Sequence, residues 1–326
     1  MKYFITFMLA ILMIFHLNAQ NTTNSKTKAA NTAPHSIYPK GAIDNIELSV
    51  TIIGSGNPQY NIDRSGPSAL VQHNGVKFLV DMGNGTRAQL EQLGFTRRNS
   101  PDALLITHHH LDHNEEFIPM VHQKYMSPGE FLVAGPAPIK EMTDYVTKFY
   151  KEDLEYRRSN KGQTFDTNNT KATVKELAGE NTFSFKDVTI STIQVPHSIY
   201  TLAYRFDANG KSIVISGDLS YTPNLAKLAL DADILVLDCQ IIREGASQNR
   251  RARNKKGNSA HASIEEGAKM AAEAGVKTLV ITHLSGAAID EEATKAKIAE
   301  QFKGKIIIAE DFLTVSSDGE VFTLQQ

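Results

Sequence analysis

The sequence predicts a mixed α and β domain that begins near residue 45 and continues to residue 326. Short apolar runs recur along it, each bounded by Gly, Pro, Asn or Asp, which is typical of buried strands. Longer segments between them carry apolar residues at helical spacing. Moreover, four of the apolar runs are followed within a few residues by His or Asp. The runs fall into two groups, each with helices, which favours an α/β or α+β fold of two sheets packed face to face with helices outside.

The first 44 residues do not fit this pattern. Lys2 precedes a twelve-residue span, residues 4–15, whose only polar residue is Thr6, and Ala19-Gln20 offers a cleavage point. The span is too short for an ordinary membrane helix, so we expect residues 1–19 to be a secretory signal peptide. Residues 20–44, rich in Asn, Thr, Ser, Lys, Ala and Pro, are expected to form a flexible tether. The predicted protein is exported, periplasmic or secreted, without a membrane span after cleavage; an uncleaved anchor is the alternative.

Composition excludes several classes of protein. The net charge of −2 gives no bulk attraction to nucleic acid. The one cysteine, Cys239, excludes an intrachain disulfide and any multi-thiolate metal site. It follows an apolar run and is expected to be buried.

The first half of the domain opens with a strand at residues 48–53, which Gly54-Ser55-Gly56 ends. The remaining elements of this half follow from the same patterns: strands at 76–80, 103–106 and 131–134, and helices at 87–93, 115–124 and 139–158. The last helix is long and amphipathic. Its aromatic residues are core by default, but Tyr150, Tyr156, Arg157 and Arg158 could reach a substrate groove. Residues 159–172 read as a polar loop.

In the second half of the domain, apolar and polar residues alternate more regularly. Half-buried strands are expected at 182–185 and 188–193, and the Asn209-Gly210 turn joins a hairpin of 202–206 with 212–216. The later elements are helices at 224–230, 264–274 and 291–303, and strands at 234–237, 278–281, 306–309 and 312–315.

The most informative stretch is Thr-His-His-His-Leu-Asp-His at residues 107–113, directly after a predicted buried strand. His108 and His110 are two residues apart and point to the same side of extended backbone. Asp112 and His113 lie just beyond, where a turning chain can aim them at a second ion. His109 should face away. These residue types at this spacing predict a metal site.

The same arrangement recurs along the chain. Apolar strands ending at Ile193, Ile215 and Ile281 are followed by His197, Asp218 and His283. Strand ends at one edge of a sandwich can bring such side chains together and hold them rigidly. One such residue could be an ordinary polar strand end, but four occurrences, counting His108, indicate a shared site.

The cluster His108-x-His110-x-Asp112-His113, followed in order by Val195-Pro196-His197, Ser216-Gly217-Asp218 and Thr282-His283, resembles the signature of the metallo-β-lactamase superfamily. The resemblance covers about residues 45–326. Within the superfamily the chain is most similar to the ribonuclease Z-like branch, which includes exported arylsulfatases. The resemblance implies a four-layer αββα sandwich.

The resemblance also implies the ligand sets. One metal ion would take three histidines, His108, His110 and His197. The other would take Asp112, His113 and His283, with Asp218 bridging both. Imidazole and carboxylate suit two Zn²⁺ ions, and Mn or Fe is also permitted. In this family the position of Asp81 supports the metal loop.

A second pair resembles the catalytic groups of ribonuclease Z-like enzymes. His261 matches a histidine that these enzymes add outside the metal ligands, and Asp238 stands where they carry an acidic partner, more often glutamate. The resemblance makes Asp112, His261 and Asp238 the catalytic candidates. The alternative for His261 is a solvent-facing residue near a helix start. The loop between Asp238 and His261 holds a cluster of cations that could attract an anionic substrate or simply be solvated, and Arg250, Arg251 and Arg253 are its candidate contacts.

These observations favour an exported, binuclear metal-dependent hydrolase of an anionic ester, with sulfate monoesters and phosphodiesters as the leading substrates. We expect a small-molecule substrate, because no long Gly/Pro-rich arm for clamping transfer RNA is evident, and no stable nucleic-acid complex. A homodimer is a possible assembly. The alternatives are a ribonuclease Z-type or cyclic-nucleotide phosphodiesterase, a β-lactamase or lactonase, an iron redox protein and a non-catalytic binding module.

Overall fold

The structure is a computed structural model that describes residues 47–160, 162, 172–245, 260–286 and 288–323. All of these belong to the unit Ser36–Gln326. The predicted signal peptide and tether, and the candidate contacts Arg250, Arg251 and Arg253, lie outside the described residues.

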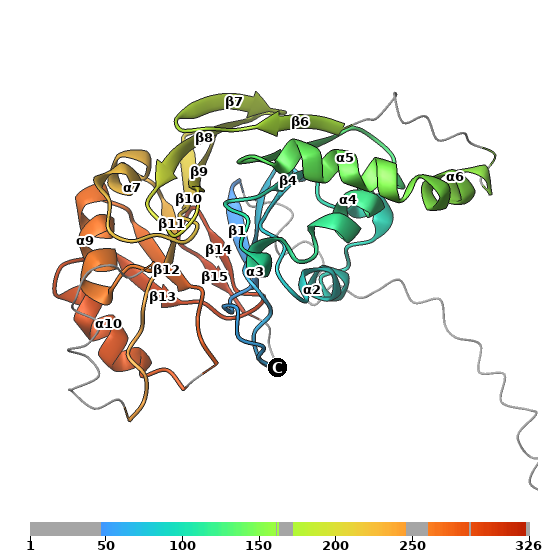
Figure 1. The fold of residues 1–326 in the computed structure, drawn as a ribbon. Coiled ribbons are helices and arrows are strands. Elements are labelled where there is room, and N and C mark those ends of the chain that lie inside the picture. The colour runs from blue at the N-terminus through green and yellow to red at the C-terminus, as the bar shows by residue number, and fades with distance from the viewer. Residues whose placement is uncertain (1–46, 161, 163–171, 246–259, 287, 324–326) are drawn as a thin grey trace, which may run out of the picture. The chain divides into compact units, whose positions relative to one another are not determined.

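Two sheets form the centre of the unit (Figure 1). The described strands of the first sheet are, in spatial order, β15 (Val321–Phe322), β14 (Thr314–Ser316), β1 (Ser49–Gly54), β2 (Ser68–His73), β3 (Val76–Val80), β4 (Ala103–Leu105), β5 (Phe131–Gly135) and β6 (Ala172–Glu176). Those of the second sheet are β13 (Lys305–Ile308), β12 (Thr278–Thr282), β11 (Ile234–Asp238), β10 (Lys211–Ile215), β9 (Thr201–Ala208), β8 (Val188–Val195) and β7 (Asn181–Phe185). Strands β3 to β6 are mutually parallel, as are β10 to β13.

Helices cover the outer face of each sheet (Figure 1). The first sheet carries α2 (Thr86–Gln92), the short helix η1 (Arg97–Asn99), α3 (Leu111–Asn114), α4 (Phe117–Tyr125), α5 (Ile139–Phe149) and α6 (Lys151–Ser159). The second carries α7 (Pro223–Leu228), α9 (Ile264–Ala274) and α10 (Glu291–Ala299). The predicted αββα sandwich is therefore confirmed. No helix among the described residues is both long enough and apolar enough to cross a bilayer.

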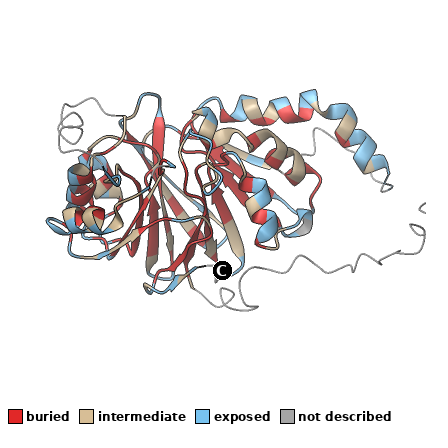
Figure 2. Cartoon of the chain, turned by 90° about the horizontal axis from the view of Figure 1, so that it is seen from below, coloured by how far each residue is buried: buried red, intermediate tan, exposed pale blue. Residues whose placement is uncertain are grey.

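Three apolar cores separate the four layers, and buried residues follow the strands of both sheets (Figure 2). The central core lies between the sheets, where Phe78 of β3 packs against Phe206 of β9 at 5.5 Å between ring centroids. Next to it the hydroxyl of Tyr204 donates to the Ile106 carbonyl at 2.8 Å, which joins β9 to the end of β4. This buried hydrogen bond links the two sheets directly beneath the histidine cluster.

The structure corrects three details of the predicted elements. Residues 139–158 form two helices instead of one, because Tyr150 has a non-helical backbone (φ −95°, ψ 19°) and ends α5 while beginning α6. Acidic Glu152 and Asp153 stand in the first turn of α6, where the helix dipole favours negative charge. Strand β6 falls in a stretch without strong alternation, and the metal loop contains the short helix α3.

Candidate metal centre

The metal loop, residues 107–113, follows β4 and is held by hydrogen bonds from its first residue. The backbone N–H and the hydroxyl of Thr107 both donate to the Asp81 carboxylate at 2.8 Å. His108 is fully buried and His110 is the N-cap of α3, so that helix carries Asp112 and His113. Gly83 packs under this loop: a Cβ there would lie 2.3 Å from the Asp112 carbonyl oxygen, so only glycine fits.

The first group of candidate ligands joins both sheets. Nδ1 of His110 lies 3.1 Å from Nε2 of His108 and 3.1 Å from Nε2 of His197, which follows β8. Oδ2 of Asp218, which follows β10, lies 3.8 Å from Nε2 of both His108 and His197. One ligand atom from each of these four residues falls within 4.8 Å of every other, close enough for one ion.

The second group lies beside the first. Oδ2 of Asp112 is 3.5 Å from Nε2 of His113 and 3.3 Å from Nε2 of His283, which follows β12. Asp218 reaches this group as well, with Oδ1 at 3.3 Å from His113 Nε2 and Oδ2 at 3.4 Å from His283 Nε2. Asp218 thus faces both groups, the geometry expected of a bridging carboxylate.

The hydrogen bonding and protonation of these side chains suit the binding of metal ions. Nε2 of His113 is buried and has no hydrogen-bond partner, while its Nδ1 bonds Asp81 Oδ2 at 2.8 Å. An imidazole with Nδ1–H donating to a carboxylate presents a lone pair at Nε2, which is the form that binds metal. Burial lowers the pKa of His108 and of His197, which keeps both imidazoles neutral, as ligation requires.

Hydrogen bonds outside the ligand set fix the orientation of the rings. His197 Nδ1 donates to the Ala260 carbonyl at 2.8 Å. His110 Nε2 is 3.2 Å from the Ser198 hydroxyl, which directs His110 Nδ1 toward the other histidines. Asp81 and His283 both have left-handed backbone (φ 60° and 62°), conformations that cost energy and persist where the surroundings enforce them.

His261 and Asp238 form a close pair at the edge of the centre. Nδ1 of His261 donates to Oδ2 of Asp238 at 2.7 Å, so the aspartate is long enough for the contact. Asp238 ends β11 and is buried, and its Oδ1 lies 3.6 Å from His283 Nδ1. The hydrogen bond to Asp238 raises the pKa of His261, favouring its protonated form. The His261 ring stacks beside His283 at 5.1 Å and half faces solvent.

The structure thus brings together all seven predicted ligands and the His261–Asp238 pair. His109 lies apart, as expected, since its Nε2 donates to the Pro136 carbonyl at 2.9 Å. Sequence reasoning missed the supporting roles of Thr107, Ser198 and Ala260. The first two are hydroxyl residues directly beside a ligand histidine, a signal that could have identified them, whereas a backbone carbonyl gives none.

Comparison with known proteins identifies the family of this chain. A model described as "Beta-lactamase superfamily domain" matches residues 77–284. The chain belongs to the metallo-β-lactamase superfamily. It is 30% identical over 273 residues to the ribonuclease Z of Mycobacterium bovis, covering 81% of this chain and 96% of that protein. The chain is therefore a ribonuclease Z-like member of a superfamily of metal-dependent hydrolases.

Solved structures agree on the superfamily fold. The metallo-β-lactamase fold protein YhfI from Bacillus subtilis has a TM-score of 0.62 and 19% identity, and the match covers 84% of this chain and 98% of that protein. Human tRNase Z, short form, has a TM-score of 0.60 and 18% identity (82% and 98% covered). Zinc-bound PqqB from Methylobacterium extorquens has a TM-score of 0.59 and 16% identity (82% and 99% covered). These likenesses show the fold, and the cluster of histidines and aspartates in this chain is itself the evidence for a metal-ion site.

The relatives correct one expectation. We expected a small-molecule anionic ester as the substrate and no nucleic-acid partner, and this is wrong, because the relatives matched over nearly their whole length are ribonucleases. The reason is physical. A net charge of −2 averages over the whole chain and says nothing of where cations gather on its surface.

Proposed function

We propose that the protein is a zinc-dependent phosphodiesterase of the ribonuclease Z type, which hydrolyses a phosphodiester bond in RNA. The observation that carries the proposal is the 30% identity to a ribonuclease Z over 96% of that enzyme's length. The two convergent ligand groups, and the histidine–aspartate pair beside them, support it.

Two Zn²⁺ ions would be held by His108, His110 and His197 and by Asp112, His113 and His283, with Asp218 shared. When bound, such a pair supplies Lewis-acid chemistry, which lowers the pKa of water from about 15.7 to about 7 and neutralises charge on a phosphoryl group. Asp81 and Ser198 would keep His113 and His110 in the ligating orientation.

The chain's own acid is His261. Water adds to phosphorus and gives up a proton, which the carboxylate of Asp112 in the second ligand group can accept. The bond from phosphorus to the leaving ribose oxygen breaks, and that oxygen must take up a proton. The hydrogen bond to Asp238 raises the pKa of His261 and favours its protonated form, and His261 lies at the partly exposed edge of the centre, so it can donate this proton. Asp238 is buried and acts through His261 as a positioning residue.

The test is cleavage of a transfer RNA precursor with a 3′ extension, and of an unrelated structured RNA, by zinc-loaded protein. We expect cleavage, about two zinc ions per chain, and loss of activity with chelator. His110→Ala should lower the rate by more than about 100-fold, since it removes a ligand whereas loss of a supporting contact alone costs 10–100-fold. His109→Ala is the matched control and should retain activity. If both RNAs stay intact with two zinc ions bound, or if His110→Ala cleaves as well as His109→Ala, the proposal fails.

We also propose, from the sequence alone, that residues 1–19 direct export. N-terminal sequencing of the mature protein should then begin near Gln20, while an intact Met1 would overturn this part. Export would place the RNA substrate outside the cytoplasm, which is why the assay includes an RNA unrelated to transfer RNA.

A further inference from the structure

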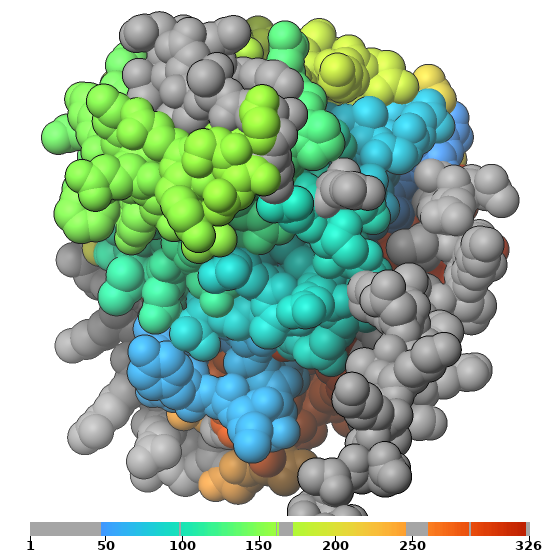
Figure 3. Space-filling view, turned by 90° about the vertical axis from the view of Figure 1, so that its right-hand side faces the viewer, coloured from blue at the N-terminus to red at the C-terminus, as the bar shows by residue number. Residues whose placement is uncertain are grey.

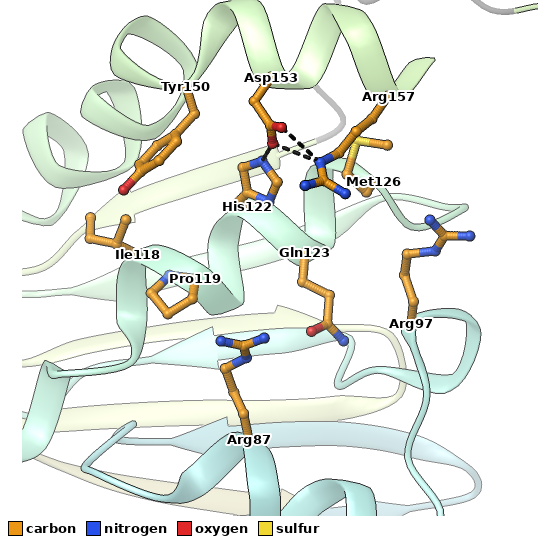
Figure 4. A pocket seen from close by; sticks show the side chains of 10 residues that line it. All are labelled: Arg87, Arg97, Ile118, Pro119, His122, Gln123, Met126, Tyr150, Asp153 and Arg157. Carbon is orange, nitrogen blue, oxygen red and sulfur yellow. Dashed lines mark hydrogen bonds and ion pairs between the residues drawn. The ribbon is translucent and has the colours of Figure 1, made fainter. Parts of the chain in front are cut away.

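A second basic site lies outside the metal centre. It is a pocket of about 780 Å³ between α2, η1, α4 and α6, which we call the arginine pocket after Arg87, Arg97 and Arg157 (Figure 4). The three arginines come from three different elements and are all exposed. Arg87 points into the pocket from α2 and Arg157 from α6 on the opposite side (Figure 4).

The pocket has an excess of positive charge. Its lining holds three guanidinium groups and one carboxylate, that of Asp153. This carboxylate is already engaged, since Arg157 Nε donates to it at 2.8 Å and His122 Nε2 lies 2.8 Å away. Among the residues that line the pocket, the interactions join Asp153 with His122 and Arg157 and leave Arg87 and Arg97 without an ion pair (Figure 4). Two unpaired guanidinium groups facing one pocket favour an anion with several oxygens.

Exposed aromatic side chains lead into the pocket. Tyr145 and Phe149 of α5 stack at 5.0 Å and are 46% and 65% exposed. Phe149 meets Tyr150 edge to face at 5.0 Å, and Tyr150 lines the pocket. Cationic grooves with aromatic platforms are typical of single-stranded nucleic-acid binding, because phosphates contact the cations and bases stack on the rings.

The pocket is connected to the metal loop through α4. Its floor is α4, which begins three residues after the metal-loop helix α3 ends. Glu116, just before α4, accepts hydrogen bonds from the backbone N–H groups of Gly85 and Arg87, and so holds the start of α2 against α4. From Ile118 to Met126 the helix extends about 12 Å at 1.5 Å per residue. In Figure 3 the green residues of α5 and α6 lie directly beside the teal residues of this segment.

From these observations we infer that the arginine pocket binds the phosphate backbone of the RNA substrate, with neighbouring bases stacked on Tyr145 and Phe149. This inference rests on the proposed function for the identity of the substrate, and it adds a docking site separate from the reacting phosphate. A chain of net charge −2 has little general attraction for RNA, so a local cationic surface would carry the affinity. Of the residues for which the sequence left a substrate groove open as an alternative, Tyr150 and Arg157 line the pocket, Tyr156 is exposed, and Arg158 donates to the Tyr125 carbonyl.

The experiment compares Arg87→Gln/Arg97→Gln with Lys269→Gln/Lys303→Gln, which removes the same charge from exposed positions beside the other sheet. Affinity of the zinc-loaded full chain for labelled structured RNA is measured by fluorescence anisotropy at several salt concentrations, and cleavage is followed on gels. We expect the arginine variant to bind about tenfold more weakly, with a salt slope shallower by about 1.5 to 2, as for two lost phosphate contacts. Arg87→Lys/Arg97→Lys should restore most of the affinity. Hydrolysis of a synthetic aryl phosphodiester should be unchanged in every variant.

The outcomes separate this inference from the proposed function. Equal affinity and salt slope in the arginine variant and the wild type would overturn the inference and leave the function standing. RNA binding that depends on Arg87 and Arg97, without cleavage of any RNA, would support the inference and overturn the proposed function. Inorganic phosphate binding is measured by calorimetry on the same variants. Its loss in the arginine variant, with RNA binding intact, would mark a small-anion site and also overturn the inference.

Discussion

Replacing Asp81 by Asn should weaken one metal site while leaving the fold in place. Asp81 is buried and accepts three hydrogen bonds at 2.8 Å, from the Thr107 N–H, the Thr107 hydroxyl and His113 Nδ1. Asparagine is nearly the same size and tolerates the left-handed backbone of this position. It keeps one acceptor oxygen, which cannot serve both the Thr107 N–H at the Oδ1 position and the Thr107 hydroxyl and His113 Nδ1 at the Oδ2 position.

The size of the loss in metal affinity follows from the hydrogen-bond acceptor that His113 Nδ1 loses. With an amide N–H₂ in place of Oδ2, His113 Nδ1 meets a donor, and the tautomer with its lone pair at Nε2 is no longer favoured. Loss of such a supporting carboxylate costs about 10–100-fold in metal affinity, or roughly 1.4–2.8 kcal/mol. Asp81→Ala should also lower the free energy of unfolding. Three buried donors lose their acceptor at about 1 kcal/mol or more each, so the loss should be about 3 kcal/mol.

The assay is zinc competition with a chromophoric chelator, read as two binding steps per chain, together with urea unfolding of the same samples. In Asp81→Asn we expect the ion near His113 to be lost first and the ion near His108 to keep its affinity. Two sites of wild-type affinity in Asp81→Asn would refute the argument that Asp81 sets the His113 tautomer.

Two further predictions concern the proton donor and the link between the sheets. His261→Gln should lower RNA cleavage by about 10²–10⁴-fold while the chain still holds about two zinc ions, so single-turnover kinetics and metal analysis are made on one preparation; a parallel loss of zinc would show His261 to be a ligand instead. Tyr204→Phe removes the buried hydrogen bond to Ile106 and should lower the free energy of unfolding by about 1–2 kcal/mol in urea; an unchanged midpoint would show that this bond contributes nothing.

The candidate ligands could be picked out from the sequence because each group of them comes after an apolar strand, and the structure places them close together. Strand ends at one edge of a sandwich are close in space even when, as with His108 after β4 of the first sheet and His283 after β12 of the second, they belong to different sheets and are far apart in the chain. The helix break at Tyr150 was missed because amphipathic spacing continues across it, and only the acids after it mark a new helix start. The arginine pocket could not be predicted, because Arg87, Arg97 and Arg157 meet only through the packing of α2, η1 and α6. The substrate class was wrong because it was argued from the whole-chain charge and from the absence of a Gly/Pro-rich arm, neither of which reports how surface side chains are arranged.

Each ligand group takes side chains from both halves of the sandwich, with His108 and Asp112 on one side and His197 and His283 on the other. Occupancy of the centre and cohesion of the two halves are therefore linked, because an ion that binds only the closed arrangement stabilises it in proportion to its free concentration. Loss of the bound metal would then lower the stability of the folded protein as well as its activity. The metal-free protein would unfold and be cleaved by proteases more easily.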